Sequence, residues 1–579
     1  MERRLLLAIL LTFLVLTVYQ WMLPKPPPLP PGSSSTSGAR PAAAGSATAA
    51  GSNAAPGSAA TQPSAPAVET VLAEHNERTI SVNNGVVHAV FSNRGATLLS
   101  WELLTYHDNT GHAVDLVARD VPAGTPKPFA LRLDDAAKTA RVNSALFASA
   151  APSGPLDASV TPVSIAFEYQ DAAGLHVRKQ FRFDPNSYVM SLTTAVTDGD
   201  RAVIPWIELG PGLGDTTALP PGGRYVRRAE AIQSSGGKVQ RIAAAAVDKT
   251  PRYDGTYEFA GVDTHYFIAA AVHPGTVSME YHSLTIQSPN VTPPISRDYV
   301  IGSIKPAQPA PLRFYIGPKE LRALRNVDPQ MVPAIWFGMF SFLTVPLLSA
   351  LNWIHGFVGN YGWSILVLTL LINAVMFPLR HKSFVSMRKM QEIQPQIKMI
   401  QDRYSKLKMS DPARQKMNTE MMDLYRSKGV NPASGCVPML LTMPILLAFY
   451  NLLSEAIELR GAPFALWIHD LSLPDPFYVL PILMGISQLA QQRMAPAAAD
   501  PAQQKMMLVM PVVFTFLFLT SPSGLALYWA SSNIMMIGQQ LLTNRLIGPP
   551  DIRVPRPPAE RRLKKVGEGK TEAATENAE

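Results

Sequence analysis

Uncharged polar side chains recur in the apolar carboxy-terminal half of this chain. Thr369 and Asn373 are four residues apart, so they share one face of a helix. Thr442, Tyr528 and Ser532 lie in other apolar segments. Within a membrane such groups bond neighbouring helices, and each bond contributes about 0.6 kcal/mol. They can instead line a shared, partly hydrated cavity, and the sequence leaves both alternatives open.

Three of five apolar segments carry these side chains, and none of the five contains Asp, Glu, Lys, Arg or His. The segments are Gly362–Leu379, Gly435–Leu453, Phe477–Gln491, Met506–Thr520 and Ser523–Asn544. Ion- and proton-coupled transporters need ionisable groups inside the membrane to bind and release the driving ion. The pattern therefore argues against a coupled transporter.

The sequence also lacks the residue patterns that nucleotide binding and metal binding need. Gly569-Lys570-Thr571 resembles the end of a P-loop, but Lys564 occupies the position of its first glycine. A single cysteine excludes an intrachain disulfide and a multi-cysteine metal site, and the histidines show no metal-ligand spacing. We expect no catalytic residue, no metal, no cofactor and no enzymatic activity.

The amino-terminal residues predict a membrane anchor followed by a flexible linker. Charged residues make up only 16% of the 579 residues, against about one quarter in a soluble domain. Arg3 and Arg4 precede the uncharged run Leu5–Leu23, which is nearly long enough to cross a hydrocarbon core of about 30 Å. Residues 1–23 are expected to form an uncleaved anchor. Residues 24–69, rich in Pro, Ala, Gly, Ser and Thr, form the linker.

Residues 70–318 predict an all-β sandwich. Short runs rich in β-branched residues are separated by turn signals such as Asn83-Asn84-Gly85. The predicted strands are Thr79–Val82, Val86–Ser92, Thr97–Leu104, Val163–Tyr169, His176–Phe183, Tyr188–Val196, Tyr266–Val272 and Thr276–His282. Their spacing is typical of antiparallel sheets packed face to face.

Charge decides the expected topology. Met331–Ile354 is also long enough to cross a membrane, but the loop at 380–431 carries twelve Lys and Arg against five Asp and Glu. Basic loops stay in the cytoplasm, and a span at Met331–Ile354 would place this loop outside. Region 319–355 is therefore expected to lie along the outer membrane surface as an amphipathic helix.

The resulting fold class is a polytopic α-helical membrane protein with an all-β sandwich domain on the outer side of the membrane. Six transmembrane helices are expected, one in the anchor and five in a core at 356–545 that includes the cytoplasmic loop. The tail at 546–579 is basic and charged, so both termini are expected in the cytoplasm.

The cytoplasmic loop predicts a helical hairpin. Met390, Ile393 and Ile397 recur at three- and four-residue steps, Pro395 should kink this helix, and Asp411-Pro412 should start a second one. The methionines either pack the two helices together or contact varied apolar segments, with the basic face meeting lipid headgroups or ribosomal RNA. Both can hold, because a two-helix hairpin leaves part of each apolar face uncovered.

Four motifs across about 330–545 carry a family resemblance. They are Gly359–Ser364 (GNYGWS), Asn431–Pro438 (NPASGCVP) with Met443-Pro444-Ile445, Arg460–Ser472 (RGAPFALWIHDLS), and Pro522–Leu525 (PSGL) leading into Tyr528-Trp529. This half resembles the Oxa/Alb/YidC superfamily of membrane protein insertases. The amino-terminal half, which closes with Tyr315–Lys319 (YIGPK), is similar to the Gram-negative form with a large periplasmic domain.

The resemblance implies a groove that is open to the cytoplasm and lipid and is closed on the far side. Polar residues of the second and sixth helices would meet the substrate there, and the matching positions are Thr369 and, beside Tyr528, Trp529. Where the family usually carries an arginine, this chain has Asn373, which still offers donors and an acceptor. The candidate substrate-groove residues are Thr369, Asn373, Thr442, Tyr528, Trp529 and Ser532.

The implied function is insertion, folding and assembly of newly made membrane proteins in the bacterial inner membrane, alone or with the Sec translocon. The implied partners are nascent membrane proteins, the Sec translocon, the ribosome (through the hairpin and the basic tail) and membrane lipids. No small-molecule substrate is expected. The alternative is a membrane scaffold with a periplasmic binding domain that translocates nothing.

Overall fold

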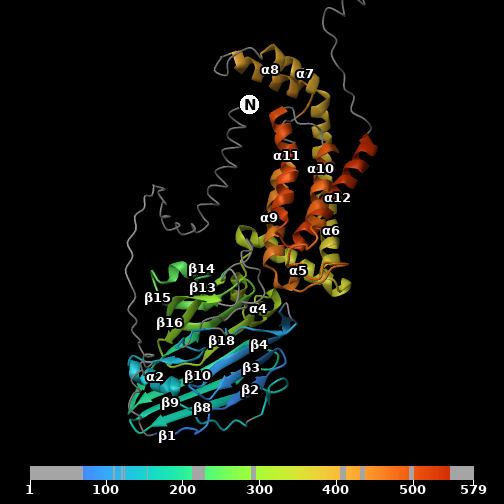
Figure 1. Cartoon of the computed structure of the whole chain (residues 1–579). Coiled ribbons are helices and arrows are strands. Elements are labelled where there is room, and N and C mark those ends of the chain that lie inside the picture. The colour runs from blue at the N-terminus through green and yellow to red at the C-terminus, as the bar shows by residue number, and fades with distance from the viewer. Residues whose placement is uncertain are drawn as a thin grey trace, which may run out of the picture.

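The computed structural model describes residues 70–108, 111–118, 121–122, 124–152, 154–210, 228–288, 295–404, 413–430, 437–494 and 501–547. The expected anchor and linker, and the expected tail from residue 548 onward, lie outside these residues. Figure 1 shows a β-rich part with a set of upright helices above it.

Two sheets build the β-rich part. The five-stranded sheet has the order β5-β4-β3-β2-β7. Its strands are β5 (Ala113–Asp115), β4 (Thr97–His107), β3 (Val87–Ser92), β2 (Thr79–Asn83) and β7 (Leu156–Asp157).

The thirteen-stranded sheet has the main order β1-β8-β9-β10-β18-β16-β15-β13-β14, and β6, β11, β12 and β17 pair beside this path. Its strands are β1 (Thr70–Leu72), β6 (Leu131–Arg132), β8 (Val163–Asp171), β9 (Leu175–Phe183), β10 (Val189–Asp198), β11 (Arg201–Val203), β12 (Trp206–Gly210), β13 (Glu230–Ser235), β14 (Lys238–Ala243), β15 (Arg252–Asp263), β16 (Phe267–Ser288), β17 (Ile295–Pro306) and β18 (Leu312–Pro318). Two short helices, α2 (Ala136–Ser144) and α3 (Ala244–Val247), interrupt the strands.

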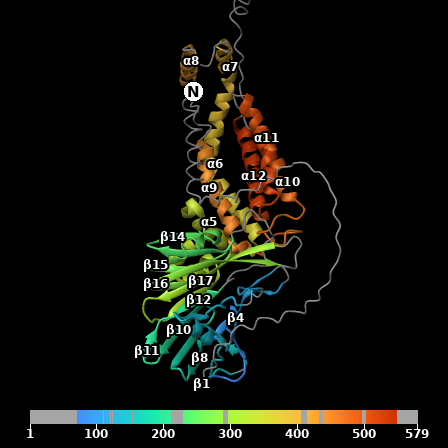
Figure 2. The ribbon, with the colours of Figure 1, turned by 60° about the vertical axis from the view of Figure 1, so that its left-hand side comes forward.

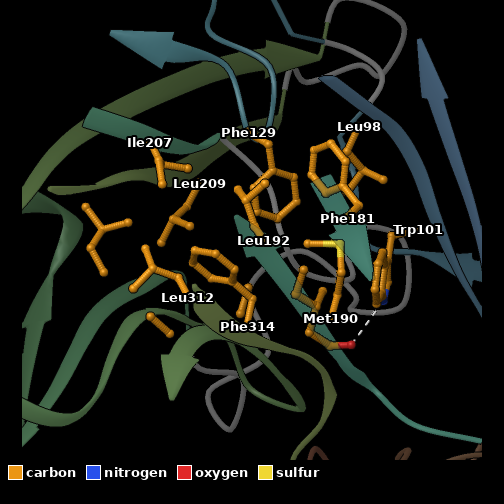
Figure 3. Close-up of a cluster of buried hydrophobic side chains, with 14 of the residues drawn as sticks. Leu98, Trp101, Phe129, Phe181, Met190, Leu192, Ile207, Leu209, Leu312 and Phe314 are labelled. Carbon is orange, nitrogen blue, oxygen red and sulfur yellow. Dashed lines mark hydrogen bonds between the residues drawn. The ribbon is translucent and has the colours of Figure 1, made fainter. Parts of the chain in front are cut away.

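An aromatic core joins the two sheets. Phe91 of β3 lies 4.5 Å from Phe181 of β9, measured between ring centroids. Trp101 of β4 is fully buried, and its Nε1 donates a hydrogen bond to Ile316 O of β18 at 3.0 Å. Figure 3 shows Trp101 beside Met190 and Phe181 in this layer. Contacts between strands so far apart in sequence confirm the sheet-on-sheet packing that the alternating pattern predicts.

One strand prediction was wrong. The sequence pattern predicts two strands, Tyr266–Val272 and Thr276–His282, whereas the structure has a single strand, β16. His273 and Gly275 adopt positive φ angles of 46° and 75°, and the pairing of β15 with β16 shifts register here. Before this irregularity β16 pairs with β18, and after it with β17. A bulge redirects the strand without ending it, so Pro274-Gly275 is not a turn.

The carboxy-terminal half is helical. Its elements are α4 (Leu321–Val327), the 3₁₀ turns η1 (Pro329–Ala334) and η2 (Gly338–Phe340), α5 (Ser341–Val358), α6 (Tyr361–Glu392), α7 (Gln394–Arg403), α8 (Ala413–Ser427), α9 (Val437–Glu455), η4 (Ile457–Leu459), α10 (Val479–Met494), α11 (Pro501–Phe518) and α12 (Ser523–Ile547). The five predicted apolar segments are confirmed as the helices α6, α9, α10, α11 and α12.

The segment Met331–Ile354 is not one continuous helix. Pro333 lies in η1, and the regular helix α5 begins only at Ser341. One face of α5 buries Leu348 and Leu351, while Phe342 and Trp353 remain exposed. Figure 1 shows α5 at the base of the upright helices, next to the β-rich part. By length and composition, Gly338–Val358 and Tyr361–Glu392 are candidate membrane spans among the described residues.

The expected hairpin is present as α7 and α8, which lie beyond the end of α6 in both views (Figures 1 and 2). Pro395 starts a new helix and does not simply kink a continuous one, since α6 ends at Glu392 and α7 begins at Gln394. Ile397 and Met421 are buried between the helices. This agrees with methionines that pack the hairpin, and the predicted cap at Asp411-Pro412 lies outside the described residues.

Candidate functional site

Two of the candidate residues lie on α6 and are buried. Thr369 has no exposed surface, and Asn373 is 3% exposed. The Thr369 hydroxyl donates to Ile365 O at 2.6 Å, and the Asn373 amide donates to Thr369 O at 2.8 Å. Both side chains therefore bond their own helix, as polar residues commonly do in an apolar environment.

A charged residue joins this polar face. Arg380 lies seven residues after Asn373 on α6, and its Nη1 donates to Asn373 Oδ1. The guanidinium thus points back along the helix toward the apolar segment. No ion pair links it to a carboxylate in the described part of the chain. The predicted apolar segment contains no charged residue, but Arg380, which directly follows it, brings a positive charge to Asn373.

The neighbouring helix α12 completes the arrangement. Gln539 Nε2 donates to Asn373 O at 3.0 Å, and His381 Nδ1 lies 3.3 Å from Thr543 Oγ1. The later residue of α6 contacts the later residue of α12, so the two helices run parallel. We call Asn373, Arg380, His381, Gln539 and Thr543 the α6–α12 polar seam.

A second polar contact joins α10 to α12. Asn533 Nδ2 donates to Ser487 Oγ at 3.2 Å, deeper in the bundle than the polar seam. Gln488 Oε1 and Gln540 Oε1 are buried and accept no hydrogen bond from the residues that the structure describes. A buried acceptor without a donor costs about 1–3 kcal/mol, so these two oxygens favour contact with water or a polar ligand.

The other candidate residues are spread over several contacts. Tyr528 stacks on Phe449 of α9 at 4.2 Å between ring centroids, and Trp529 packs on Phe518 of α11 at 5.0 Å. Ser532 is buried in α12. Thr442 lies on α9, but its side chain is outside the described part of the chain. Asn373 is therefore brought to α12, whereas Tyr528 and Trp529 face α9 and α11.

Sequence reasoning missed Arg380 and Gln539. Arg380 directly follows the apolar segment, so it was counted with the cytoplasmic loop. Its spacing of seven residues from Asn373 places both on one helix face and was the available signal. Gln539 lies within a predicted span, and only the packing of α12 against α6 distinguishes it from other polar residues there.

Most of the chain matches known proteins. Residues 353–549 match the family model described as 60Kd inner membrane protein, and residues 79–350 match that of the YidC periplasmic domain. The membrane protein insertase YidC of Geotalea daltonii is 33% identical over 561 residues, which cover 94% of this chain and 99% of that protein. The chain belongs to the YidC family of membrane protein insertases.

Other relatives agree with this assignment. The membrane protein insertase YidC of Oleidesulfovibrio alaskensis is 34% identical over 495 residues, which cover 82% of this chain and 88% of that protein. A solved structure described as an active YidC insertase with the first transmembrane domain resolved is 18% identical. The match covers 82% of this chain and 95% of the chain in that structure, with a TM-score of 0.33.

Membership of this family locates the two parts of the molecule relative to the inner membrane. The chain is an inner membrane protein that joins a helical membrane core to a periplasmic β domain. The polar seam and the α10–α12 contact lie in the helical core, within residues 353–549. Among the described residues, no group of three or more His, Cys, Asp or Glu is placed to hold a metal ion.

Proposed function

We propose that this insertase receives nascent membrane proteins at the α6–α12 polar seam, which opens toward the cytoplasm. The observation that carries the proposal is the Arg380 guanidinium bonded to Asn373 beside Gln539. A cation in this position, with no carboxylate partner in the described residues, suits an acidic segment that flanks a hydrophobic substrate helix. Opening the seam would expose Arg380, Asn373 and Gln539 together.

The energetics require no nucleotide and no covalent step. An apolar segment of about 20 residues gains roughly 6–12 kcal/mol on entering lipid, at about 0.3–0.6 kcal/mol per residue. One charged flanking residue at the bilayer centre costs about 2.5–3.5 kcal/mol. The main barrier to insertion is therefore the transfer of the polar flanking residues across the bilayer. A hydrated path past Thr369, Asn373, Thr442 and Ser532 lowers it, so we propose a non-enzymatic insertase without a cofactor.

The proposed topology has six membrane-crossing helices and both termini in the cytoplasm. Five of the helices are α6, α9, α10, α11 and α12, and the anchor at 1–23 supplies the sixth. α5 lies along the periplasmic membrane surface, which its exposed Phe342 and Trp353 suit. The hairpin α7–α8 and the basic tail are proposed contacts for the ribosome and lipid headgroups, and the Sec translocon is the proposed partner for larger substrates.

A photocrosslinking experiment tests the seam as the substrate path. A photoreactive amino acid at Asn373 or Trp529 should capture a nascent membrane protein during its insertion. The same label at exposed Val160 of the β domain is the control and should capture little. If the labels at Asn373 and Trp529 stay unreactive while insertion proceeds, the substrate does not follow this path. Stranding of small membrane proteins in the cytoplasm on depletion would distinguish an insertase from a scaffold.

The role of Arg380 is tested by moving its charge. Arg380→Gln should reduce insertion of a substrate with an acidic flank about tenfold and leave a neutral-flanked substrate within about twofold, because one charge pair is lost. Lys382→Gln, an exposed position two residues away, is the matched control. The double variant Asn373→Arg with Arg380→Gln should restore insertion, since the charge returns to the seam. Equal loss for both substrates would contradict a charge-specific role.

A further inference from the structure

The periplasmic domain and the helical core share a closely packed contact surface. η4 follows α9 after one residue, and its Ile457 is 1% exposed within the hydrophobic cluster of the β domain. Leu459 of the same turn belongs to the cluster that continues into the core helices. The end of a core helix is thus anchored in the β domain.

Polar contacts surround this anchor. His265, in the turn between β15 and β16, is 3% exposed, and its Nε2 lies 3.0 Å from Ser454 O. The Arg460 guanidinium lies 5.3 Å from the ring centroid of Phe267, and its Nη2 donates to His107 O at 3.4 Å. These contacts fix the orientation of η4 against the β domain.

Glu458 occupies the middle of this surface. Asn352 of α5 donates to Glu458 Oε1 at 3.4 Å, and Tyr361 donates to Asn352 Oδ1 at 3.2 Å. Glu458 Oε2 is buried and accepts no hydrogen bond from the described residues. Across the surface lies Glu320, which follows β18 and accepts a hydrogen bond from Tyr106 at 3.3 Å. The charge of Glu320 acts on Glu458, so the two carboxyl groups interact where the domain meets the core.

We propose that Glu458 and Glu320 form a proton-sensitive latch between the periplasmic domain and the helical core. With Glu458 protonated, the surface holds no buried anion at this point, and the two parts stay docked. Ionised Glu458 is a buried charge beside a second carboxylate, which favours separation of the surfaces and hydration of η4. The titratable and charged groups around Glu458 are Glu320, Tyr106 of β4, Arg322 of α4, Tyr361 of α6 and His355, which stacks on Tyr361.

The direction of the pH effect follows from burial. Burial raises the pKa of Glu458 from 4.5 to about 7, and the charge of Glu320 adds to this effect. The docked state therefore binds a proton that an undocked, hydrated Glu458 releases at lower pH. Docking is strongest below pH 4.5, weakens as the pH rises to about 7, and is constant above that value. Between pH 5.5 and 8.5 the docking equilibrium should fall about 30-fold, since each pH unit up to 7 changes it about tenfold.

Distance measurements on the full-length chain in lipid nanodiscs test the latch. Spin labels would be attached at Val160→Cys in the β domain and Ala465→Cys in the core, both exposed, in a Cys436→Ala background. With Glu458 and Glu320 unchanged, the two spin labels should give one narrow distance distribution at pH 5.5. At pH 8.5 a second population with a longer distance should appear. Glu458→Gln, which keeps the shape and removes the titration, should keep the narrow distribution at both pH values.

A second variant and a control make the result specific. Glu320→Gln removes the repelling charge, so the longer population at pH 8.5 should be smaller than in the unsubstituted protein. Glu168→Gln, at a partly exposed carboxylate of β8 paired with Arg178, should respond like the unsubstituted protein. Identical distances at pH 5.5 and 8.5, or a Glu458→Gln variant that still responds to pH, would overturn the latch. The measurement does not involve substrate, so it is independent of the proposed insertion path.

Discussion

Lys179 of β9 is fully buried, and its partners in the described part of the chain are backbone carbonyl groups instead of a carboxylate. Its Nζ donates to Gly95 O at 2.6 Å, to Ala96 O at 3.2 Å and to Phe129 O at 2.8 Å. Ala96 and Phe129 have positive φ angles of 46° and 67°, a conformation that costs a non-glycine residue free energy. The ammonium group therefore holds two strained turns against the thirteen-stranded sheet.

At this residue we predict that Lys179→Met lowers the free energy of unfolding of the β domain by at least about 3 kcal/mol. Three buried carbonyl oxygens lose their donor, and each unsatisfied acceptor costs about 1–3 kcal/mol. Hydrogen exchange of the β9 amides in the full-length chain measures the change. Lys249→Met, at an exposed position, is the control and should have little effect. Unchanged exchange in β9 would mean that other contacts hold the turns.

At the scale of elements, α10 and α11 approach closely at a glycine. A Cβ placed on Gly485 would lie 2.1 Å from Thr515 Oγ1. That hydroxyl donates to Pro511 O at 2.8 Å, so it cannot turn away without losing a hydrogen bond. The absence of a side chain at Gly485 is therefore what permits the distance between the two helices.

We predict that Gly485→Leu destabilises the helical core by about 1–3 kcal/mol, because it forces α10 and α11 apart. Gly538→Leu on α12 is the matched control, since a Cβ there meets no atom within 4 Å. Thermal unfolding of the detergent-solubilised protein compares the two variants. Equal melting temperatures for Gly485→Leu and Gly538→Leu would show that α11 adjusts its position freely.

At the scale of the whole molecule, the β domain is held to the core by both apolar and charged contacts. Asp263 of β15 is fully buried between Lys319, at 2.8 Å, and Arg241, at 3.2 Å. Arg241 also donates to Ala334 O at 2.6 Å and so ties β14 to η1. These contacts join the β domain to η1, and Ile457 of η4 joins it to the end of α9.

We predict that Ile457→Ala weakens docking by about 2–5 kcal/mol without unfolding either part, because it removes a buried side chain from the shared surface. Hydrogen exchange should then increase in η4 and in the turn at Thr264–Phe267, while β9 keeps its protection. Leu466→Ala, at a side chain that is 82% exposed, serves as the control. Faster exchange throughout the β domain would indicate unfolding and contradict simple undocking.

The amino-acid sequence by itself determined the positions of the five apolar helices and most of the strands that were predicted. These features depend on local patterns: runs without charge, alternation of apolar residues and turn residues between strands. The sequence also supplied the family motifs and the polar residues on α6. It misjudged β16, where Pro274-Gly275 forms a bulge whose nature depends on which strands pair on each side.

Only the tertiary structure decided which polar groups meet. Arg380 bonds to Asn373, Gln539 joins α12 to α6, and Glu458 faces Glu320 from a segment more than one hundred residues away in sequence. Such contacts depend on the packing of helices and domains that are distant along the chain. Local propensity carries no information about them, because a side chain can pair only with whatever the fold brings within hydrogen-bonding distance.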